Sequence, residues 1–88
     1  MRFVIVTGMS GAGKSTALKM LEDVGYFCVD NLPVPMVTKL VDLLRMPNAE
    51  INKIALGLDI RSIHGFQELE QSLVALDDMQ LSYEVLFL

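Results

Sequence analysis

The sequence predicts an α/β fold with a partial parallel sheet of about four strands flanked by helices. Short apolar runs alternate along the chain with segments in which apolar residues recur every three or four positions, and this alternation is typical of βαβ units. The composition agrees, because 52% of the 88 residues are apolar and the mean hydropathy is +0.45. Strands covered by helices on both faces contain such continuous apolar runs. The length allows one domain.

The expected elements are separated by residues that end strands and helices. Gly8 ends the first apolar run, Gly25 ends the first helical pattern, and prolines occur in residues 30–33 and 46–48. In chain order we expect a strand over 2–7, a helix over 14–24, a strand over 26–29, a helix carrying Val37, Leu40, Val41 and Leu44, a strand over 53–60, a helix carrying Phe66, Leu69, Leu73 and Leu76, and a strand over 83–88.

In a sheet of this kind, right-handed crossovers place the loop after each strand at one edge of the sheet. Ligands of open α/β sheets bind at that carboxyl edge. The segment after the first predicted strand is therefore the first place to look for chemistry. It consists of Gly8, Met9, Ser10, Gly11, Ala12, Gly13, Lys14 and Ser15.

These eight residues match the phosphate-loop pattern G-x-x-x-x-G-K-[ST], known as Walker A, at every fixed position. Its glycines let successive backbone N–H groups turn toward phosphate oxygens, and the positive end of the following helix points at the same place. Lys14 supplies an ammonium for the β- and γ-phosphates, and the Ser15 hydroxyl can ligate Mg²⁺. The sequence therefore predicts a P-loop NTPase fold that binds a nucleoside triphosphate.

Two aspartates are candidates for the second magnesium ligand. Asp59 follows the apolar run of the third predicted strand, as a Walker B carboxylate does. Asp30 follows the second strand and competes for that role; its alternative role is a turn or helix-capping residue before Pro33. Arg61 follows the third strand and could either reach a phosphate or be a solvated loop charge.

Charge and cysteine content exclude several classes of protein. The net charge is −4 and the isoelectric point about 4.7, with no basic stripe of the kind that binds nucleic acid. The single cysteine, Cys28, cannot form an internal disulfide and is expected in the core. The apolar residues 3–6 are too few for a signal peptide, and no run is long enough to cross a bilayer. We expect a cytoplasmic protein without membrane contact.

Three stretches together resemble the RapZ/YvcJ family of bacterial nucleotide-binding proteins, which includes the RNase adapter protein. They are residues 8–15, residues 21–33 (LEDVGYFCVDNLP), and the run Asp59, Ile60, Arg61 and Ser62. The resemblance implies binding of ATP or GTP with slow hydrolysis, with nucleotide contacts at residues 8–15 and 59–62. It also implies a role of the full-length proteins in regulatory RNA or in cell-wall and competence control.

Members of that family continue well beyond the length of this chain. We therefore expect residues 1–88 to be the N-terminal part of a P-loop nucleotide-binding domain, with RNA contacts carried by a C-terminal domain outside it. The apolar last strand, residues 83–88, predicts self-association through an unpaired edge. Lys14 and Asp59 are the expected catalytic residues, and Ser15 and Asp59 the expected metal ligands. The alternatives are a small-molecule kinase without its lid and acceptor regions, and a regulatory fragment whose loop binds only phosphate.

Overall fold

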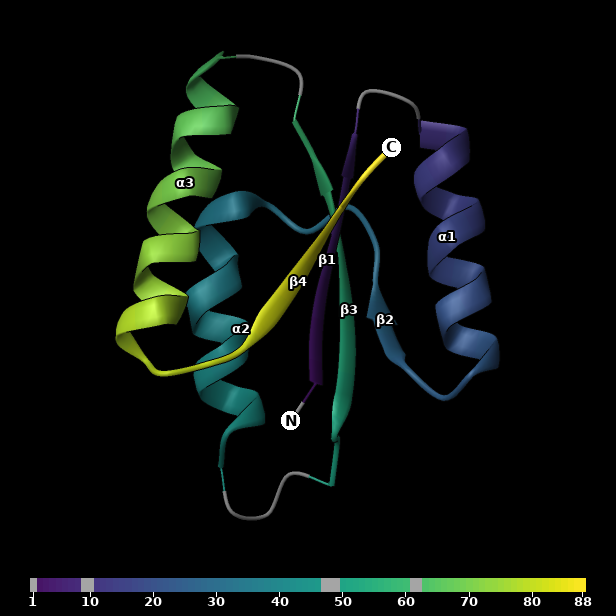
Figure 1. The fold of residues 1–88 in the computed structure, drawn as a ribbon, viewed down its shortest axis with the longest axis horizontal. Coiled ribbons are helices and arrows are strands. Elements are labelled where there is room, and N and C mark those ends of the chain that lie inside the picture. Colours follow the sequence, from purple (N-terminus) through teal and green to yellow (C-terminus); the bar gives the residue numbers. More distant parts are fainter. Residues whose placement is uncertain (1, 9–10, 47–49, 61–62) are drawn as a thin grey trace.

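The computed structural model describes residues 2–8, 11–46, 50–60 and 63–88. Helices and strands alternate through these residues as predicted, and Figure 1 shows their arrangement. In chain order they are β1 (Arg2–Gly8), α1 (Gly11–Asp23), β2 (Phe27–Val29), the 3-10 turn η1 (Val34–Met36), α2 (Val37–Leu44), β3 (Lys53–Asp59), α3 (Ile63–Asp78) and β4 (Tyr83–Phe87).

The four described strands form one parallel sheet in the order β2-β3-β1-β4. This confirms the predicted α/β class, and it places β3 directly beside β1. In the β1–β3 ladder Arg2 is opposite Lys53 and Gly8 is opposite Asp59. The ends of these two strands are therefore neighbours at the carboxyl edge of the sheet. One end carries Gly8, the first glycine of the loop, and the other carries Asp59.

Helices cover both faces of the sheet, α1 on one side and α2 with α3 on the other (Figure 1). Successive strand residues point to opposite faces, so each central strand contributes to two cores. On the α1 side Val4, Val6, Ala55 and Leu18 pack together. The larger core, on the α2 and α3 side, includes Phe3, Ile5, Ile54, Leu56, Leu58, Val37, Val41, Leu69 and Leu76. Burial on both faces explains the continuous apolar runs.

Several element boundaries differ from the ranges expected from the sequence. Tyr26 lies outside β2 because its N–H is bonded to the Leu21 carbonyl of α1, next to Gly25 at φ +99°. Helix α3 begins at Ile63, three residues before Phe66, and Nε2 of His64 lies 2.8 Å from Oε1 of Glu68 one turn later. Helix α1 begins at Gly11 and so takes in glycines that were expected to lie in the loop.

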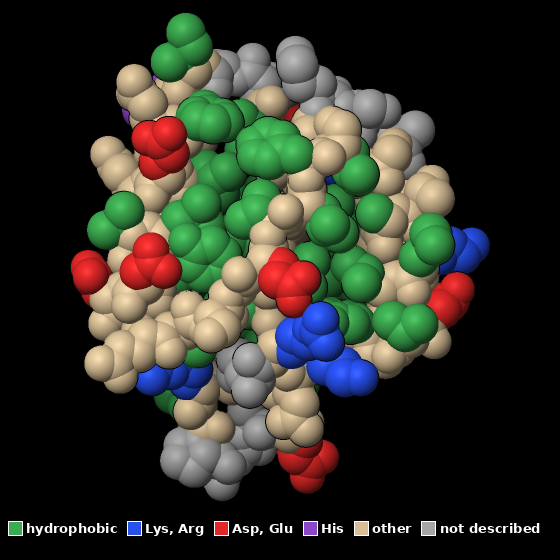
Figure 2. Space-filling model, viewed as in Figure 1, with side chains coloured by type: hydrophobic (Ala, Val, Ile, Leu, Met, Phe, Trp, Pro, Cys, Tyr) green, Lys and Arg blue, Asp and Glu red, His purple; other side chains and the backbone are tan. Residues whose placement is uncertain are grey.

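Strand β4 lies at one end of the sheet order, with apolar side chains at its surface. Figure 2 shows hydrophobic side chains gathered on both sides of this strand. Phe87 is 63% exposed, and its ring lies 6.3 Å from the Phe66 ring of α3, measured between centroids. Among the helices described here, none is long and apolar enough to cross a membrane.

Candidate functional site

The candidate site lies at the carboxyl edge of the sheet, where β1 leads into α1. Gly8 is the last residue of β1, and α1 begins at Gly11. The N-terminal end of α1 therefore lies next to the ends of β1 and β3. A helix N-terminus carries partial positive charge and free N–H groups, and both favour an anion at this place.

Lys14 is the cation of this site, and its side chain is only 8% exposed. Its ammonium nitrogen donates a hydrogen bond to the Leu58 carbonyl oxygen at 3.2 Å. The same nitrogen lies 3.3 Å from Oδ1 of Asp59, whose side chain is 28% exposed. A buried ammonium requires such partners because its desolvation is costly. The end of β3 thus supplies both acceptors that hold Lys14 at the carboxyl edge.

Behind this ion pair, β2 and α1 pack closely against Gly57 of β3. A Cβ atom added at Gly57 would lie 2.7 Å from Cδ1 of Leu18 and 2.8 Å from Oδ1 of Asp30. The glycine therefore allows the chain after β2 to approach β3, and the Leu32 N–H donates to the Gly57 carbonyl at 3.0 Å. The sequence prediction did not include this contact, although a glycine inside an apolar strand is a signal that can indicate it.

The two roles left open for Asp30 can be compared with its contacts. Oδ1 of Asp30 accepts a hydrogen bond from the Asn31 N–H at 2.7 Å, and Asn31 has φ +56°. This local bond is the one expected of an aspartate in a turn. The ion pair that the structure forms with Lys14 goes instead to Asp59. The turn role is therefore supported, and a metal role for Asp30 stays a prediction.

The remaining predicted site residues fall into two groups. Met9, Ser10, Arg61 and Ser62 lie outside the described residues. Gly11, Ala12, Gly13 and Ser15 belong to the first turns of α1, where Ser15 is exposed. Ile60 follows β3, and its side chain is buried in the larger core, so a contact between Ile60 and a ligand would go through its backbone.

Among the described residues of this edge, a magnesium ion would find oxygen donors but no protein cage. The described residues contain no group of three or more His, Cys, Asp or Glu side chains arranged to hold a metal. Mg²⁺ commonly binds one or two protein oxygens and completes its shell with phosphate oxygens and water. The Asp59 carboxylate and the exposed Ser15 hydroxyl fit that chemistry, because both belong to segments that meet at the carboxyl edge.

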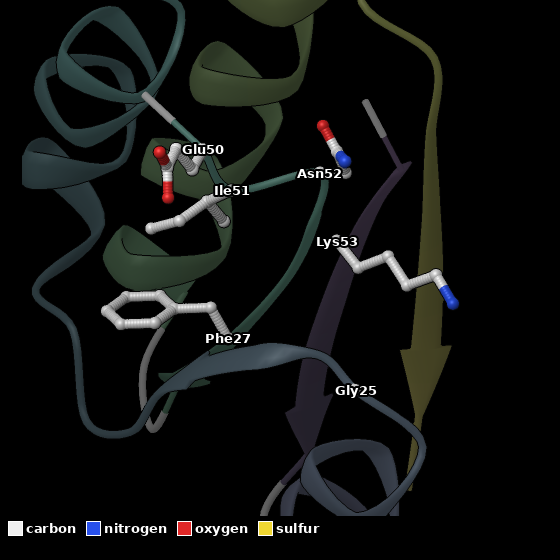
Figure 3. Close-up of a pocket in the computed structure, with 6 residues that line it drawn as sticks. All are labelled: Gly25, Phe27, Glu50, Ile51, Asn52 and Lys53. Atoms are coloured by element: carbon white, nitrogen blue, oxygen red, sulfur yellow. The ribbon is translucent and has the colours of Figure 1, made fainter. Parts of the chain in front are cut away.

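Two other features lie apart from this edge. A surface hollow lined by Gly25, Phe27, Glu50, Ile51, Asn52 and Lys53 opens near the amino ends of β2 and β3 (Figure 3). Cys28 of β2 is partly buried, and its thiol donates to the Leu18 carbonyl at 3.2 Å. Burial raises the pKa of the Cys28 thiol, and the Glu22 carboxylate adds to the increase. The cysteine is therefore a packing residue with little thiolate.

A four-stranded parallel sheet with a phosphate-loop pattern between its first strand and first helix defines the P-loop class of α/β proteins. Within this class, the chain belongs to the RapZ-like N-terminal domain family, whose sequence model matches residues 1–88.

Curated relatives match over the whole chain. It is 57% identical to a "Nucleotide-binding protein" of Lachnoclostridium phytofermentans and 52% identical to one of Agathobacter rectalis. It is 49% identical to "Nucleotide-binding protein CD630_34000" of Clostridioides difficile. In each comparison the match covers 100% of this chain and 30% or 31% of the relative. The chain thus spans less than a third of the length of these proteins.

Proposed function

We propose that this chain binds a nucleoside triphosphate, ATP or GTP, together with Mg²⁺, and that it supports slow hydrolysis. The observation that carries the proposal is the position of Lys14, which lies at the carboxyl edge between the end of β3 and the start of α1. The relatives' name, "Nucleotide-binding protein", supports the coarser part of this proposal, a nucleotide as the ligand.

The proposed roles follow from the chemistry of each group. Backbone N–H groups of residues 8–15 surround the phosphates, and Lys14 neutralises charge on the β- and γ-phosphates. Ser15 and Asp59 hold Mg²⁺, which withdraws charge from the phosphate oxygens when it is bound. Residues 59–62 form a second contact with the nucleotide. Phosphoryl transfer requires mainly positioning and charge stabilisation from the protein, so this small set suffices for slow turnover.

The test compares two lysines of the same helix. Lys14→Ala removes the proposed phosphate ligand, whereas Lys19→Ala removes an exposed lysine of α1 with the same change in net charge. Titration with a fluorescent ATP or GTP analogue and Mg²⁺ should show an affinity loss of about tenfold or more for Lys14→Ala, because charge-assisted hydrogen bonds contribute about 1.5–3 kcal/mol. Lys19→Ala should bind as the unmodified chain does. Unchanged affinity in Lys14→Ala would refute the proposal.

A second measurement separates hydrolysis from kinase activity. Phosphate release by the unmodified chain should be slow and independent of added hydroxyl compounds. Nucleotide consumption that rises sharply with one acceptor would favour the kinase alternative.

Regulatory RNA, cell-wall and competence roles concern the full-length proteins, and we propose that RNA contacts belong to the part of the relatives beyond this chain. The net charge of −4 agrees with that assignment. A cytoplasmic location stays a prediction.

A further inference from the structure

The surface hollow near the amino ends of β2 and β3 lies at the edge of the parallel sheet opposite the proposed nucleotide site. Its volume of about 320 Å³ falls within the roughly 300–1,000 Å³ that is typical of ligand pockets. Gly25 and Phe27, which line the hollow, belong to the stretch 21–33 that supports the family resemblance. The proposed function gives these two residues no role, so the hollow is a second place to look for a ligand.

The side chains of the hollow place an aromatic ring and an acid on the same side. Figure 3 shows the Phe27 ring, the Ile51 side chain and the Glu50 carboxylate on one side of the space that they line. Phe27 is 47% exposed, although it belongs to a strand. Within the part of the chain that the structure describes, no hydrogen bond or ion pair engages the exposed Glu50 carboxylate. An open aromatic face and an unpaired carboxylate thus flank the same space.

Lys53 also lines the hollow, but it does not neutralise Glu50. Its side chain points away from the Glu50 carboxylate (Figure 3), and its ammonium lies 5.9 Å from the centroid of the Tyr26 ring. Arg2 is opposite Lys53 in the β1–β3 ladder, and its guanidinium lies 3.1 Å from the Glu84 carboxylate. Both cations therefore have partners of their own, and the charge of Glu50 stays available to a ligand.

A carboxylate beside an exposed aromatic ring is complementary to the side chain of arginine. A guanidinium group stacks on an aromatic face and donates paired hydrogen bonds to a carboxylate, whereas the ammonium of lysine is a compact charge that is more strongly hydrated. The apolar stem of an arginine packs on apolar surface, which Ile51 supplies on the same side of the hollow. The net charge of −4 also attracts basic partners.

We propose that this hollow is a docking site for an arginine side chain of a partner protein, with the Phe27 ring and the Glu50 carboxylate as its contacts. The hollow and the phosphate loop lie at opposite edges of the sheet. Partner and nucleotide can therefore be bound at the same time, and nucleotide binding is not a condition of the docking. A second copy of this chain, which also carries arginines, is the alternative occupant.

The experiment titrates the isotopically labelled chain with capped pentapeptides of glycine that carry a central arginine, lysine or citrulline. Backbone amide shifts are followed by NMR at a concentration at which sedimentation shows a monomer. The arginine peptide should shift the amides of Phe27, Ile51 and Asn52 and leave that of Lys14 unchanged, with the millimolar affinity of a single side-chain contact. Citrulline keeps the shape of arginine without its charge, so its peptide should bind about tenfold more weakly or less still. The lysine peptide should lie between the two.

Variants of the chain test the two contacts separately. Glu50→Gln keeps the shape of the side chain and removes its charge, so it should weaken binding of the arginine peptide by about tenfold or more. Phe27→Leu removes the aromatic face and should weaken it by about threefold. Glu70→Gln changes an exposed glutamate of α3 outside the hollow, with the same change in net charge, and should bind the peptide as the unmodified chain does.

Several outcomes would overturn the inference. Equal binding of the arginine and citrulline peptides would show that no charged contact forms, and this comparison uses the unmodified chain alone. Unchanged affinity in Glu50→Gln would place the peptide elsewhere, and an equal loss in Glu70→Gln would assign the effect to net charge. Shifts of the same amides when the chain is concentrated without peptide would assign the hollow to a second copy of the chain.

Discussion

The ion pair between Lys14 and Asp59 also predicts how the stability of the fold depends on its two partners. At a separation of 3.3 Å, the Coulomb attraction is about 5 kcal/mol at an effective dielectric constant of about 20. Water reaches the partly exposed Asp59, and desolvation of Lys14 opposes the attraction, so the net interaction is smaller. We expect a coupling free energy of about 2–3 kcal/mol between the two side chains.

The two single substitutions should differ in their cost. Asp59→Asn leaves a buried ammonium with the Leu58 carbonyl but without its counter-ion, which should lower the free energy of unfolding by about 2–3 kcal/mol. Lys14→Met keeps the apolar stem packed, and Asp59 can hydrate through its exposed part, so the cost should be about 1 kcal/mol. In the double variant the cost should be close to that of Lys14→Met alone.

Urea unfolding of the unmodified chain, the two single variants and the double variant, followed by circular dichroism, measures this cycle. Low ionic strength and the absence of Mg²⁺ and nucleotide keep the ion pair intact during the measurement. Additive single costs, with a coupling below about 0.5 kcal/mol, would refute the reasoning. That result would mean that the two side chains lie near each other without interacting.

Three further predictions follow from other contacts of the chain. Gly57→Ala should lower the free energy of unfolding by about 1–3 kcal/mol because the added methyl group meets Leu18 and Asp30. A thermal unfolding midpoint equal to that of the unmodified chain would contradict this. Cys28 should react with iodoacetamide at pH 8 more slowly in the folded chain than in the urea-unfolded chain. The raised pKa keeps the thiol protonated, so the alkylation rate of the folded chain should increase only at higher pH. Equal rates in the two states would contradict the packing role. The chain should self-associate with increasing concentration in sedimentation experiments. Phe87→Lys on β4 should weaken the association, whereas Val74→Lys, at an exposed position of α3, should not. A monomer at high concentration would contradict the edge-strand prediction.

The sequence predicted the order of the elements and the parallel sheet because both follow from patterns that one segment displays by itself. Strands buried on both faces produce runs such as that of β1, and helices with one buried face produce the spacing of Val37 and Val41. The start of α1 at Gly11 could not be predicted this way. Glycine is a poor helix former, so local propensity favoured a later start, and contacts with the ends of β1 and β3 are needed to reverse that preference.

The pairing of Lys14 with Asp59 illustrates a second limit. Motif spacing assigned each residue a ligand, phosphate for the lysine and metal for the aspartate, and so described the site with its ligands bound. The motif spacing contained no information on how the two charged side chains interact when no ligand is bound. The register of β1 with β3 aligns Gly8 with Asp59, and in the folded chain the Lys14 ammonium lies 3.3 Å from Oδ1 of Asp59. The pair is a tertiary contact, and neither segment alone displays it.

Asp30 shows how a structural role can prepare a chemical one. Its Oδ1 is held by the Asn31 N–H, and the following Leu32 is tied to β3 through the Gly57 carbonyl. These bonds hold the carboxylate next to Gly57 of β3, where a Cβ atom added to the glycine would also meet Leu18 of α1. A side chain held in this way loses little further freedom on meeting a ligand. The turn role is therefore compatible with a role at the site, because the turn holds a second carboxylate next to Gly57, two residues before Asp59 in β3.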